Sequence, residues 1–483
     1  MIETELAAPD AASRAVTRDL AAFAVNVDAT SIPGDRLELL HLAVLDTVGV
    51  AVAASREKSG RIVSQYAQAF GPGSGATVFG CPRGARVPAE FAALANGTMA
   101  HALDFDDMHT RLAGHPSAVL VPAVLALAEE VGSSGDDVLT AMAVAYEVVH
   151  RVAALMGYPA LFAGFHPTGV WAPVGTAAAA ARLLGLSIDQ ACMALGIAAS
   201  QAGGLRANFG SMVKPFHAGH GGMAGIMAAK LAALGFVAGD DAIGGPNGFV
   251  HCYGGDRERI AEVVEGLGTR WFPLEGYSVK LYPACGKTHA TVDAALALRG
   301  ECSVEAIDRI TIDADESVAD VLPYSRPATG LQAKFSLEYA AVVALLDGKA
   351  GLAQYTDERL ADPRLQDLLM KTESRLSPGN TEEQFFVNET VTLHLQDGRQ
   401  LTNQVAREAG DLGQEVPRED VVRKFRDCCE GTLSDAAVDA FLAGWETLAT
   451  MPDVSAWMRG LQGAGADSSD SPDACPHVRS DAL

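Results

Sequence analysis

Aromatic side chains are scarce in this chain of 483 residues, at 6%, although hydrophobic residues make up 49%. The apolar mass is therefore mostly Ala, Val and Leu, small side chains that suit close packing of helices, and the composition favours a mainly α protein. The length also exceeds the size at which one hydrophobic core keeps growing, so we expect at least two packed units.

Cysteine pairs with C-x-x-C spacing are missing as well. None of the eight cysteines belongs to a C-x-x-C motif, which argues against a structural zinc and against an iron–sulfur cluster of common spacing. We therefore expect neither of these metal centres, and interpret most of the cysteines as buried thiols.

Basic residues are few: 36 Lys and Arg face 60 Asp and Glu, which gives a formal charge of -24. Such an excess repels nucleic acid and anionic membrane surfaces, so we expect neither as a partner. A small anionic substrate is not excluded, because charges beyond a Debye length of ~8 Å are screened and a local cationic cluster controls its own pocket.

Long apolar runs are also absent, since no stretch reaches ~18 uninterrupted apolar residues. The first residues, "MIETELAAPDAAS", carry acids where a secretory signal would have Lys or Arg before an apolar run. We expect a cytoplasmic protein.

What is present predicts a large helical domain over residues 16–270. The stretch "DDVLTAMAVAYEVVHRVAALMG" has apolar residues at helical spacing behind acidic first-turn residues. "LSIDQACMALGIAAS" opens with a capping box from Ser187 to Gln190, and "GMAGIMAAKLAALGF" ends at Gly235, a natural helix end.

The pattern changes after Trp271, and residues 271–405 are predicted to form a smaller α+β domain. "IDRITIDA" alternates, and "ETVTLHLQDGRQLTNQV" alternates on both sides of Asp397-Gly398, a hairpin signal. Helices are expected near Thr288 and Ser336. The fold class is therefore a mainly α protein with a large all-helical domain and an inserted smaller domain, which together should form a cleft.

Helical periodicity returns over residues 406–460, so these helices are expected to rejoin the large domain. Residues 1–15 and the Ser/Asp/Gly-rich residues 461–483 are predicted to be disordered and to carry no chemistry.

One segment, "HALDFDDMHTRLAGHPS" at 101–117, holds three carboxylates, three histidines and an arginine. On a helix, Asp104 and Asp107 would share a face while Asp106 points away. A magnesium–diphosphate site or a carbocation cyclase would need a second acidic helix or an aromatic cavity, and the low aromatic content weighs against both. A proton-transfer site and a merely solvated helix end remain.

Three other segments add cationic and imidazole side chains to otherwise apolar sequence, where burying them without a use is expensive. They are "GFHPTGVWAPVG" with His166, "GGLRANFGSMVKPFHAGHGG" with Arg206, Lys214, His217 and His220, and "SVKLYPACGKTHATVDA" with Lys280, Tyr282, Cys285, Lys287 and His289.

These segments resemble the MmgE/PrpD family, which includes 2-methylcitrate dehydratase, cis-aconitate decarboxylase and iminodisuccinate epimerase. The resemblance is carried, in family order, by "NGTMAHALDFDD", "HPS", "FHPTG", "GSMVKPFHAG", "YPACGKTHATVDA", "RPATGLQAKFSLEYA" and "DGRQ". It covers nearly the whole chain and implies a cofactor-independent homodimer with a large helical domain and an inserted α+β domain.

The resemblance also implies site residues: Asp104, His115, His166 and Lys214 lie at positions similar to the family's active-site residues, and Tyr324 lies near its tyrosine. His289 is added to these as an expected catalytic residue, and the residues expected to bind substrate are Arg206, Lys280, Cys285 and Met108. Cys285 departs from the decarboxylase pattern, which has a histidine there, and leaves His289 as the nearest imidazole. "GSMVKPFHAG" is closer to the decarboxylase and epimerase branch than to methylcitrate dehydratase.

The main functional hypothesis is a lyase that dehydrates or decarboxylates a small di- or tricarboxylate through a carbanion beside a carboxylate. Lysines would stabilise the developing charge, His115 and His166 would transfer protons, and Asp104 would orient a histidine. The first alternative is an epimerase or isomerase that removes and returns a proton at one carbon. The second is a pseudoenzyme or biosynthetic relative with a less polar ligand, motivated by Cys285 and Met108.

Overall fold

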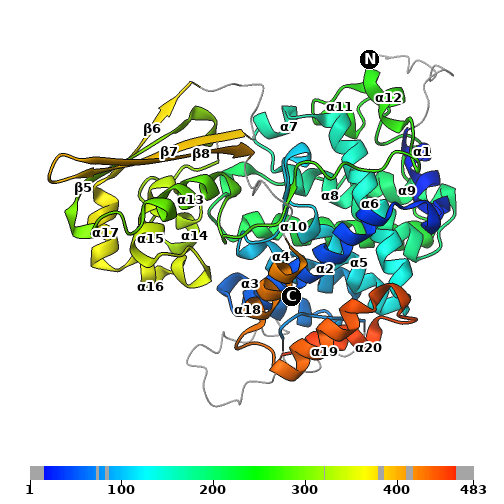
Figure 1. Cartoon of the computed structure of the whole chain (residues 1–483). Helices are drawn as coiled ribbons and strands as arrows, with labels where there is room; N and C mark the ends of the chain where they lie inside the picture. Colours follow the sequence, from blue (N-terminus) through cyan, green and yellow to red (C-terminus); the bar gives the residue numbers. More distant parts are fainter. Residues whose placement is uncertain are drawn as a thin grey trace, which may run out of the picture.

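The computed structural model describes residues 16–71, 75–81, 86–319, 321–378, 386–408 and 417–463. The chain is mainly α, with a large helical domain and a smaller domain beside it that holds a four-stranded sheet (Figure 1). Residues 1–15 and nearly all of 461–483, where disorder is predicted, lie outside the described residues.

The helical domain is built from segments at both ends of the chain. Its N-terminal part contains α1 (Val16–Asn26), α2 (Gly34–Ala54), α3 (Lys58–Gln68), α4 (Ala89–Ala102), α5 (Ser117–Val131), α6 (Gly135–Met156), α7 (Pro159–Phe162), α8 (Pro167–Leu183), α9 (Ile188–Ala199), α10 (Val213–Ala233), α11 (Phe249–Cys252) and α12 (Ile260–Val264). Its C-terminal part contains α18 (Arg418–Cys429), α19 (Asp435–Glu446) and α20 (Ser455–Met458). Residues of both parts share one hydrophobic core, in which α18 packs against α2.

Local sequence signals explain where several of these helices begin. The capping box at Ser187 is present, with Gln190 bonded back to the Ser187 backbone, and a second box at Ser134 and Asp137 starts α6. The periodic apolar positions of α6 are buried, as the pattern predicts. Helix α10 ends at Ala233, two residues before the predicted Gly235.

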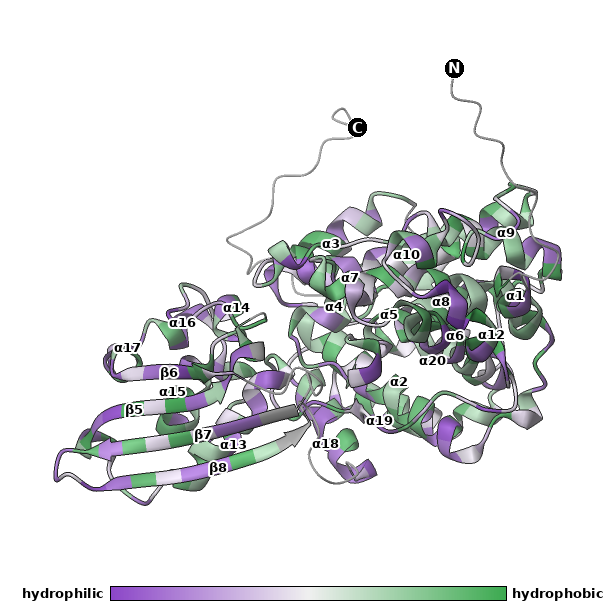
Figure 2. Ribbon diagram, turned by 90° about the horizontal axis from the view of Figure 1, so that it is seen from above, coloured by the Kyte–Doolittle hydropathy of each residue, from purple (hydrophilic) through white to green (hydrophobic). Residues whose placement is uncertain are grey.

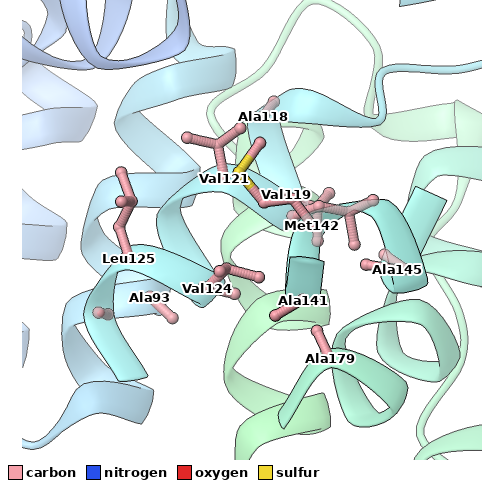
Figure 3. Packing of buried hydrophobic residues seen from close by; sticks show 14 of the residues in the cluster. Ala93, Ala118, Val119, Val121, Val124, Leu125, Ala141, Met142, Ala145 and Ala179 are labelled. Atoms are coloured by element: carbon pink, nitrogen blue, oxygen red, sulfur yellow. The ribbon is translucent and has the colours of Figure 1, made fainter. Parts of the chain in front are cut away.

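Neighbouring helices lie close together because most of the side chains between them are small and few are aromatic. Figure 3 shows small side chains such as Ala118, Ala141 and Ala145 packed with Met142 between neighbouring helices. Where α4 crosses α10, a Cβ on Gly219 would lie 2.1 Å from the Leu94 carbonyl oxygen, so only glycine fits. This close crossing brings the C-terminus of α4 beside the N-terminus of α10.

Two helices, α2 and α6, are long and apolar enough to cross a membrane by length and composition alone. Their apolar windows are 72% and 89% buried inside the protein, as core helices of a folded domain also are. The absence of a membrane partner stays a prediction.

The smaller domain has a core of its own around a sheet in the order β6-β5-β7-β8. The strands are β5 (Ile307–Asp315), β6 (Thr372–Ser377), β7 (Phe386–Leu395) and β8 (Gln400–Glu408). β5 runs parallel to β6 and antiparallel to β7, and β7 pairs with β8 through the predicted hairpin at Asp397-Gly398. Hydrophobic and polar bands alternate along these strands in Figure 2, as expected of a sheet covered on one face.

Helices α13 (His289–Leu298) and α15 (Leu337–Asp347) contribute to that small-domain core, and α13 packs on β7 and β8. They begin where the sequence predicts, one residue after Thr288 and Ser336. The remaining helices of the domain are α14 (Gly330–Ala333), α16 (Asp357–Leu360) and α17 (Pro363–Met370). The connection from the helical domain carries β4 (Tyr277–Ser278), which pairs with β3 (Met108–His109). The division at residues 270 and 405 stays a prediction.

Candidate active site

The carboxylates of residues 104–107 lie in a loop and not on a helix. α4 ends at Ala102, and Asp104 has φ of 51°, a left-handed conformation that a helix cannot contain. The expectation that Asp104 and Asp107 share a helix face while Asp106 points away is therefore wrong. The turn sends Asp104 and Asp106 toward different partners, and all three carboxylates are buried.

Asp104 is held between two lysines. Lys214 Nζ lies 2.9 Å from Asp104 Oδ2, and Lys280 Nζ contacts Asp104 Oδ1 and donates to the Asp104 carbonyl at 3.0 Å. Burial alone would raise the pKa of Asp104, but the two ammonium groups outweigh it and hold that pKa well below its usual range. Asp104 is therefore an ionised partner of lysines and not, as expected from the sequence, the carboxylate that orients a histidine.

Three consecutive carbonyls after α4 each accept a hydrogen bond from a different lysine. Lys334 Nζ donates to Leu103 at 2.5 Å, Lys280 to Asp104 at 3.0 Å, and Lys424 to Phe105 at 2.6 Å. Lys334 comes from the small domain and Lys424 from α18, where it also pairs with Asp46 at 2.7 Å. Carbonyls at a helix C-terminus lack helical partners and carry partial negative charge, so ammonium groups satisfy them well.

Asp106 is the carboxylate that meets the histidines. Its Oδ2 lies 2.9 Å from His101 Nδ1 and 3.1 Å from His115 Nδ1. Burial alone would raise the pKa of Asp106, but the two imidazoles hold it well below normal, while burial lowers the pKa of His101 to about 4. His101 is therefore neutral near pH 7 and donates its Nδ1 proton to an ionised Asp106.

The partners of His115 fix its tautomer. Its Nδ1 faces only acceptors, the Asp106 carboxylate and the Asp107 carbonyl at 2.9 Å, so Nδ1 carries the proton. In the neutral ring Nε2 is then a base. Among the described residues His115 Nε2 has no hydrogen-bond partner and is not sealed from solvent, whereas Nε2 of His101 is fully buried without a partner. His115 can therefore reach a ligand, and His101 cannot.

His166 completes the cluster. Its ring centroid lies 5.7 Å from that of His101 and 5.1 Å from that of Phe209, and its Nδ1 lies 3.1 Å from His217 Nδ1. The Phe209 ring is also 5.4 Å from Lys214 Nζ. Asp104, His115, His166 and Lys214, which the sequence places in four segments, thus converge between α4, α8 and α10.

Four groups of this cluster have the spacing of metal ligands. One donor atom each from His101, Asp104, Asp106 and His115 lies within 4.8 Å of the others. Two ammonium groups already occupy the Asp104 oxygens and would repel a divalent cation at short range. The donor set therefore fits an ion poorly, and the expectation of no metal and no cofactor stays a prediction.

The side chain of Asp107 has different partners, the hydroxyl groups of a hydrogen-bonded chain. Its carboxyl accepts from Tyr277 Oη at 2.6 Å and contacts Ser117 Oγ, which in turn meets Tyr146 Oη. Burial, only partly offset by these donors, raises the pKa of Asp107 to about 7. Asp107 thus joins the start of α5, α6 and the inter-domain connection.

The contacts that the described residues show for the other predicted residues lie outside the cluster. His289 contacts the Ala284 carbonyl and the Tyr282 ring within the small domain. Arg206 donates to the Leu161 carbonyl, and Met108 lies in β3. Tyr324 is one step removed, because its hydroxyl donates to the carbonyl of Phe209 at 2.9 Å. Each of these residues is close in sequence to a residue of the cluster. Closeness in sequence, however, does not decide which way a side chain points.

Cys285 lies next to the lysine pair. Its thiol is close enough to Asp104, Lys280 and Lys214 to interact electrostatically, and burial raises its pKa, so it is a neutral thiol near pH 7. His101, Asp106, Lys334 and Lys424 were not among the site residues predicted from the sequence. For Lys334 a signal was available, its occurrence as a cation in the apolar stretch LQAKFSLEYA, which is the argument that selected Lys214. Lys424 lies in the charged stretch REDVVRKFRD, where a lysine is unremarkable.

A surface hollow between α1 and residues 264–268 contains none of the cluster residues; its lining includes Phe23, Asn26 and Asp28. The cluster lies elsewhere, where Lys334 of the small domain meets the end of α4.

Buried lysines, ionised carboxylates and neutral imidazoles in one cluster are typical of an enzyme that transfers protons on an anionic substrate. Comparison with known proteins agrees. The model of the MmgE/PrpD N-terminal domain matches residues 18–260, and that of the MmgE/PrpD C-terminal domain matches residues 282–446. The chain belongs to the MmgE/PrpD family.

Several curated proteins that are similar to this chain carry names that contain cis-aconitate decarboxylase. Cis-aconitate decarboxylase of Homo sapiens is 30% identical over 438 residues, which cover 87% of this chain and 89% of the relative. The enzyme of the same name from Aspergillus terreus is 29% identical over 459 residues, 89% of this chain and 92% of the relative. The cis-aconitate decarboxylase-like protein oryM of Aspergillus oryzae is 26% identical over 471 residues, 91% and 96%.

Proposed function

We propose that this protein is a cofactor-independent lyase that removes carbon dioxide from a small unsaturated tricarboxylate of the cis-aconitate type, or water from a related hydroxy acid. The observation that carries the proposal is the convergence of Lys214 and Lys280 with two histidines, His115 and His166, whose Nε2 atoms have no hydrogen-bond partner among the described residues. The relatives named cis-aconitate decarboxylase support the substrate class.

The charge balance of the cluster supports an anionic substrate. Four ammonium groups, of Lys214, Lys280, Lys334 and Lys424, are buried among three carboxylates, of Asp46, Asp104 and Asp106. Asp107, with its pKa near 7, adds only part of a negative charge at neutral pH. The site is therefore cationic before any ligand enters, and a substrate carboxylate is stabilised there more strongly than in water.

The residues can meet the main obstacle of the reaction, the carbanion that develops beside a carboxylate. In decarboxylation the carbon–carbon bond breaks, carbon dioxide leaves, and the electron pair stays on the adjacent carbon. Lys214 and Lys280 stabilise the neighbouring carboxylate as negative charge spreads onto it. A proton from His166 Nε2 then neutralises the carbanion.

Dehydration would use the same groups in a different order. His115 Nε2, held as a base by its Nδ1 partners, removes the carbon-bound proton. His166 gives a proton to the departing hydroxyl, so that water leaves. The neutral thiol of Cys285 lies near the lysines, where it can contact the substrate chain without adding charge.

Incubation with cis-aconitate and with citrate-like hydroxy acids in deuterium oxide, followed by proton NMR, tests the proposal. Loss of carbon dioxide or of water, with deuterium incorporated at carbon where a proton is delivered, supports a lyase. Proton exchange without loss of either group would support an epimerase instead, which the Nε2 atoms of His115 and His166 also fit. If no polycarboxylate turns over or raises the melting temperature, the proposal is wrong and the less polar ligand is favoured.

The homodimer that the family resemblance implies and the cytoplasmic location expected from the sequence remain proposals. Support for self-association comes from exposed apolar residues at the start of α10 and just before it, including Met212, Val213 and Phe216, each about 40% exposed. Light scattering of the purified protein tests it: a mass of one chain would exclude the dimer.

A further inference from the structure

His166 and His217 share a nitrogen–nitrogen contact. The two Nδ1 atoms lie 3.1 Å apart, with the ring centroids at 5.4 Å. His166 precedes α8 and His217 lies in the second turn of α10. Two lone pairs or two N–H groups would repel at this distance, so one proton lies between the two atoms.

The pair is neutral overall. Burial, strengthened by nearby cationic and imidazole groups, holds the pKa of His166 well below normal, and burial lowers the pKa of His217 to about 4. Two neutral rings carry two protons. With one at the contact, the other lies on an outer Nε2, either that of His166 or that of His217.

The two outer nitrogens face different surroundings. The His166 ring lies beside those of His101 and Phe209 in the cluster, so its Nε2 belongs to the site that we propose for the substrate. His217 is 9% exposed, and its Nε2 has no hydrogen-bond partner in the described ranges and is not sealed from solvent. The imidazole pair therefore spans the distance from the cluster to water.

The pair is also held in place. Gly204 packs directly on the His217 ring, where a Cβ would lie 3.0 Å from Cγ, and has φ of 112°. The same segment accepts a hydrogen bond from the His166 backbone, at the Gly204 carbonyl, at 2.9 Å. One short stretch of backbone therefore contacts both residues, His217 at its ring and His166 at its backbone N–H.

We propose that His217 is a proton relay that connects His166 with solvent. When His166 Nε2 gives its proton to a carbanion, His166 Nδ1 takes the contact proton from His217 Nδ1, and His217 Nε2 takes one from water. The net change is one proton moved from solvent to carbon, and both rings stay neutral with their tautomers exchanged. Run in reverse, the relay carries away a proton that His166 abstracts. The inference deepens the proposed function, on which it rests for its substrate.

Two variants and one control test the relay with cis-aconitate as substrate. His217→Ala and His217→Asn should lower kcat at least ~10-fold while KM changes less than about threefold, because proton supply and not binding is lost. Imidazole added to His217→Ala should restore part of kcat, an effect that a merely structural role would not produce. His220→Ala, three residues along α10, should leave kcat unchanged. A kcat within threefold of wild type, or no rescue in a variant that melts like wild type, overturns the proposal.

A measurement independent of turnover separates this proposal from the proposed function. In protein labelled with ¹⁵N-histidine, the shared proton should give a scalar coupling between the Nδ1 nuclei of His166 and His217. It should vanish in His217→Asn and remain in His220→Ala. If the coupling is present but no carboxylate turns over, the proposed function fails alone. If it is absent in wild type, the relay fails whatever the substrate.

Discussion

Lys334 of the small domain donates a hydrogen bond of 2.5 Å to the carbonyl of Leu103, the residue that follows α4 in the helical domain. The same ammonium donates to the Pro283 carbonyl at 2.8 Å. Leu103 precedes Asp104, so the small domain holds the backbone that presents the central carboxylate of the site.

Loss of this ammonium should loosen the Asp104 loop. We predict that Lys334→Met lowers kcat/KM by about tenfold or more, since a hydrogen bond from a charged group contributes ~1.5–3 kcal/mol. Hydrogen exchange of a peptide spanning residues 103–107 should speed up. Lys371→Met is the matched control: Lys371 also bonds a small-domain carbonyl, that of Ile307, but away from the site, and neither readout should change. Unchanged exchange in Lys334→Met would contradict the prediction.

Lys214 should matter most for the developing negative charge. We predict that Lys214→Met lowers kcat/KM with the true substrate ~100-fold or more, the usual cost of removing such a transition-state contact. Lys230→Met changes another lysine of α10, which pairs with Glu90 and Glu130 far along the helix, and should leave turnover intact. Steady-state kinetics decides, and a loss of only a few fold for Lys214→Met would remove Lys214 from the mechanism.

Asp104 should stabilise the fold through its two lysines. Replacing it by Asn leaves two buried ammonium groups without their counter-charge, so Asp104→Asn should lower the free energy of unfolding by about 3 kcal/mol or more. The exposed pair of Arg18 and Asp189 offers the contrast, since its side chains are 60% and 81% exposed. Asp189→Asn should change stability by less than ~1 kcal/mol. Urea unfolding measures both, and equal costs would refute the distinction.

Asp106 should set the tautomer of His115. In Asp106→Asn the amide can turn its NH₂ toward the imidazole, which favours a bare Nδ1 and a protonated Nε2 and so removes the base. We predict a fall in kcat of at least ~10-fold with KM within about threefold. Histidine ¹⁵N shifts should show the proton on Nδ1 in wild type and on Nε2 in the variant; an unchanged tautomer would count against this role.

Asp107 should make stability depend on pH. Its pKa is raised to about 7 in the folded chain by burial, so between pH ~4 and ~7 the folded state keeps a proton that the unfolded state has lost. Stability therefore falls as the pH rises through this range, by on the order of 1 kcal/mol per pH unit. Asp107→Asn lacks this dependence. Urea unfolding at pH 5 and 7.5 should show the difference between wild type and variant changing with pH, and a constant difference would refute it.

Much of the secondary structure followed from the sequence because its signals are local. The capping box at Ser187, the apolar period of α6 and the turn at Asp397-Gly398 depend on residues a few positions apart, whose interactions do not need the rest of the fold. The same sequence also indicated which four segments carry the chemistry, since buried cations in apolar surroundings imply a use.

Only the tertiary structure decided which charges meet. Asp104 was expected to hold a histidine, yet a left-handed turn after α4 gives it to Lys214 and Lys280 and gives the histidines to Asp106. Lys334 and Lys424 reach the same loop from 231 and 319 residues away. Sequence periodicity reports which face of an element is buried, but the partner of a buried charge depends on how distant elements close around it, and that is set by packing of the whole chain.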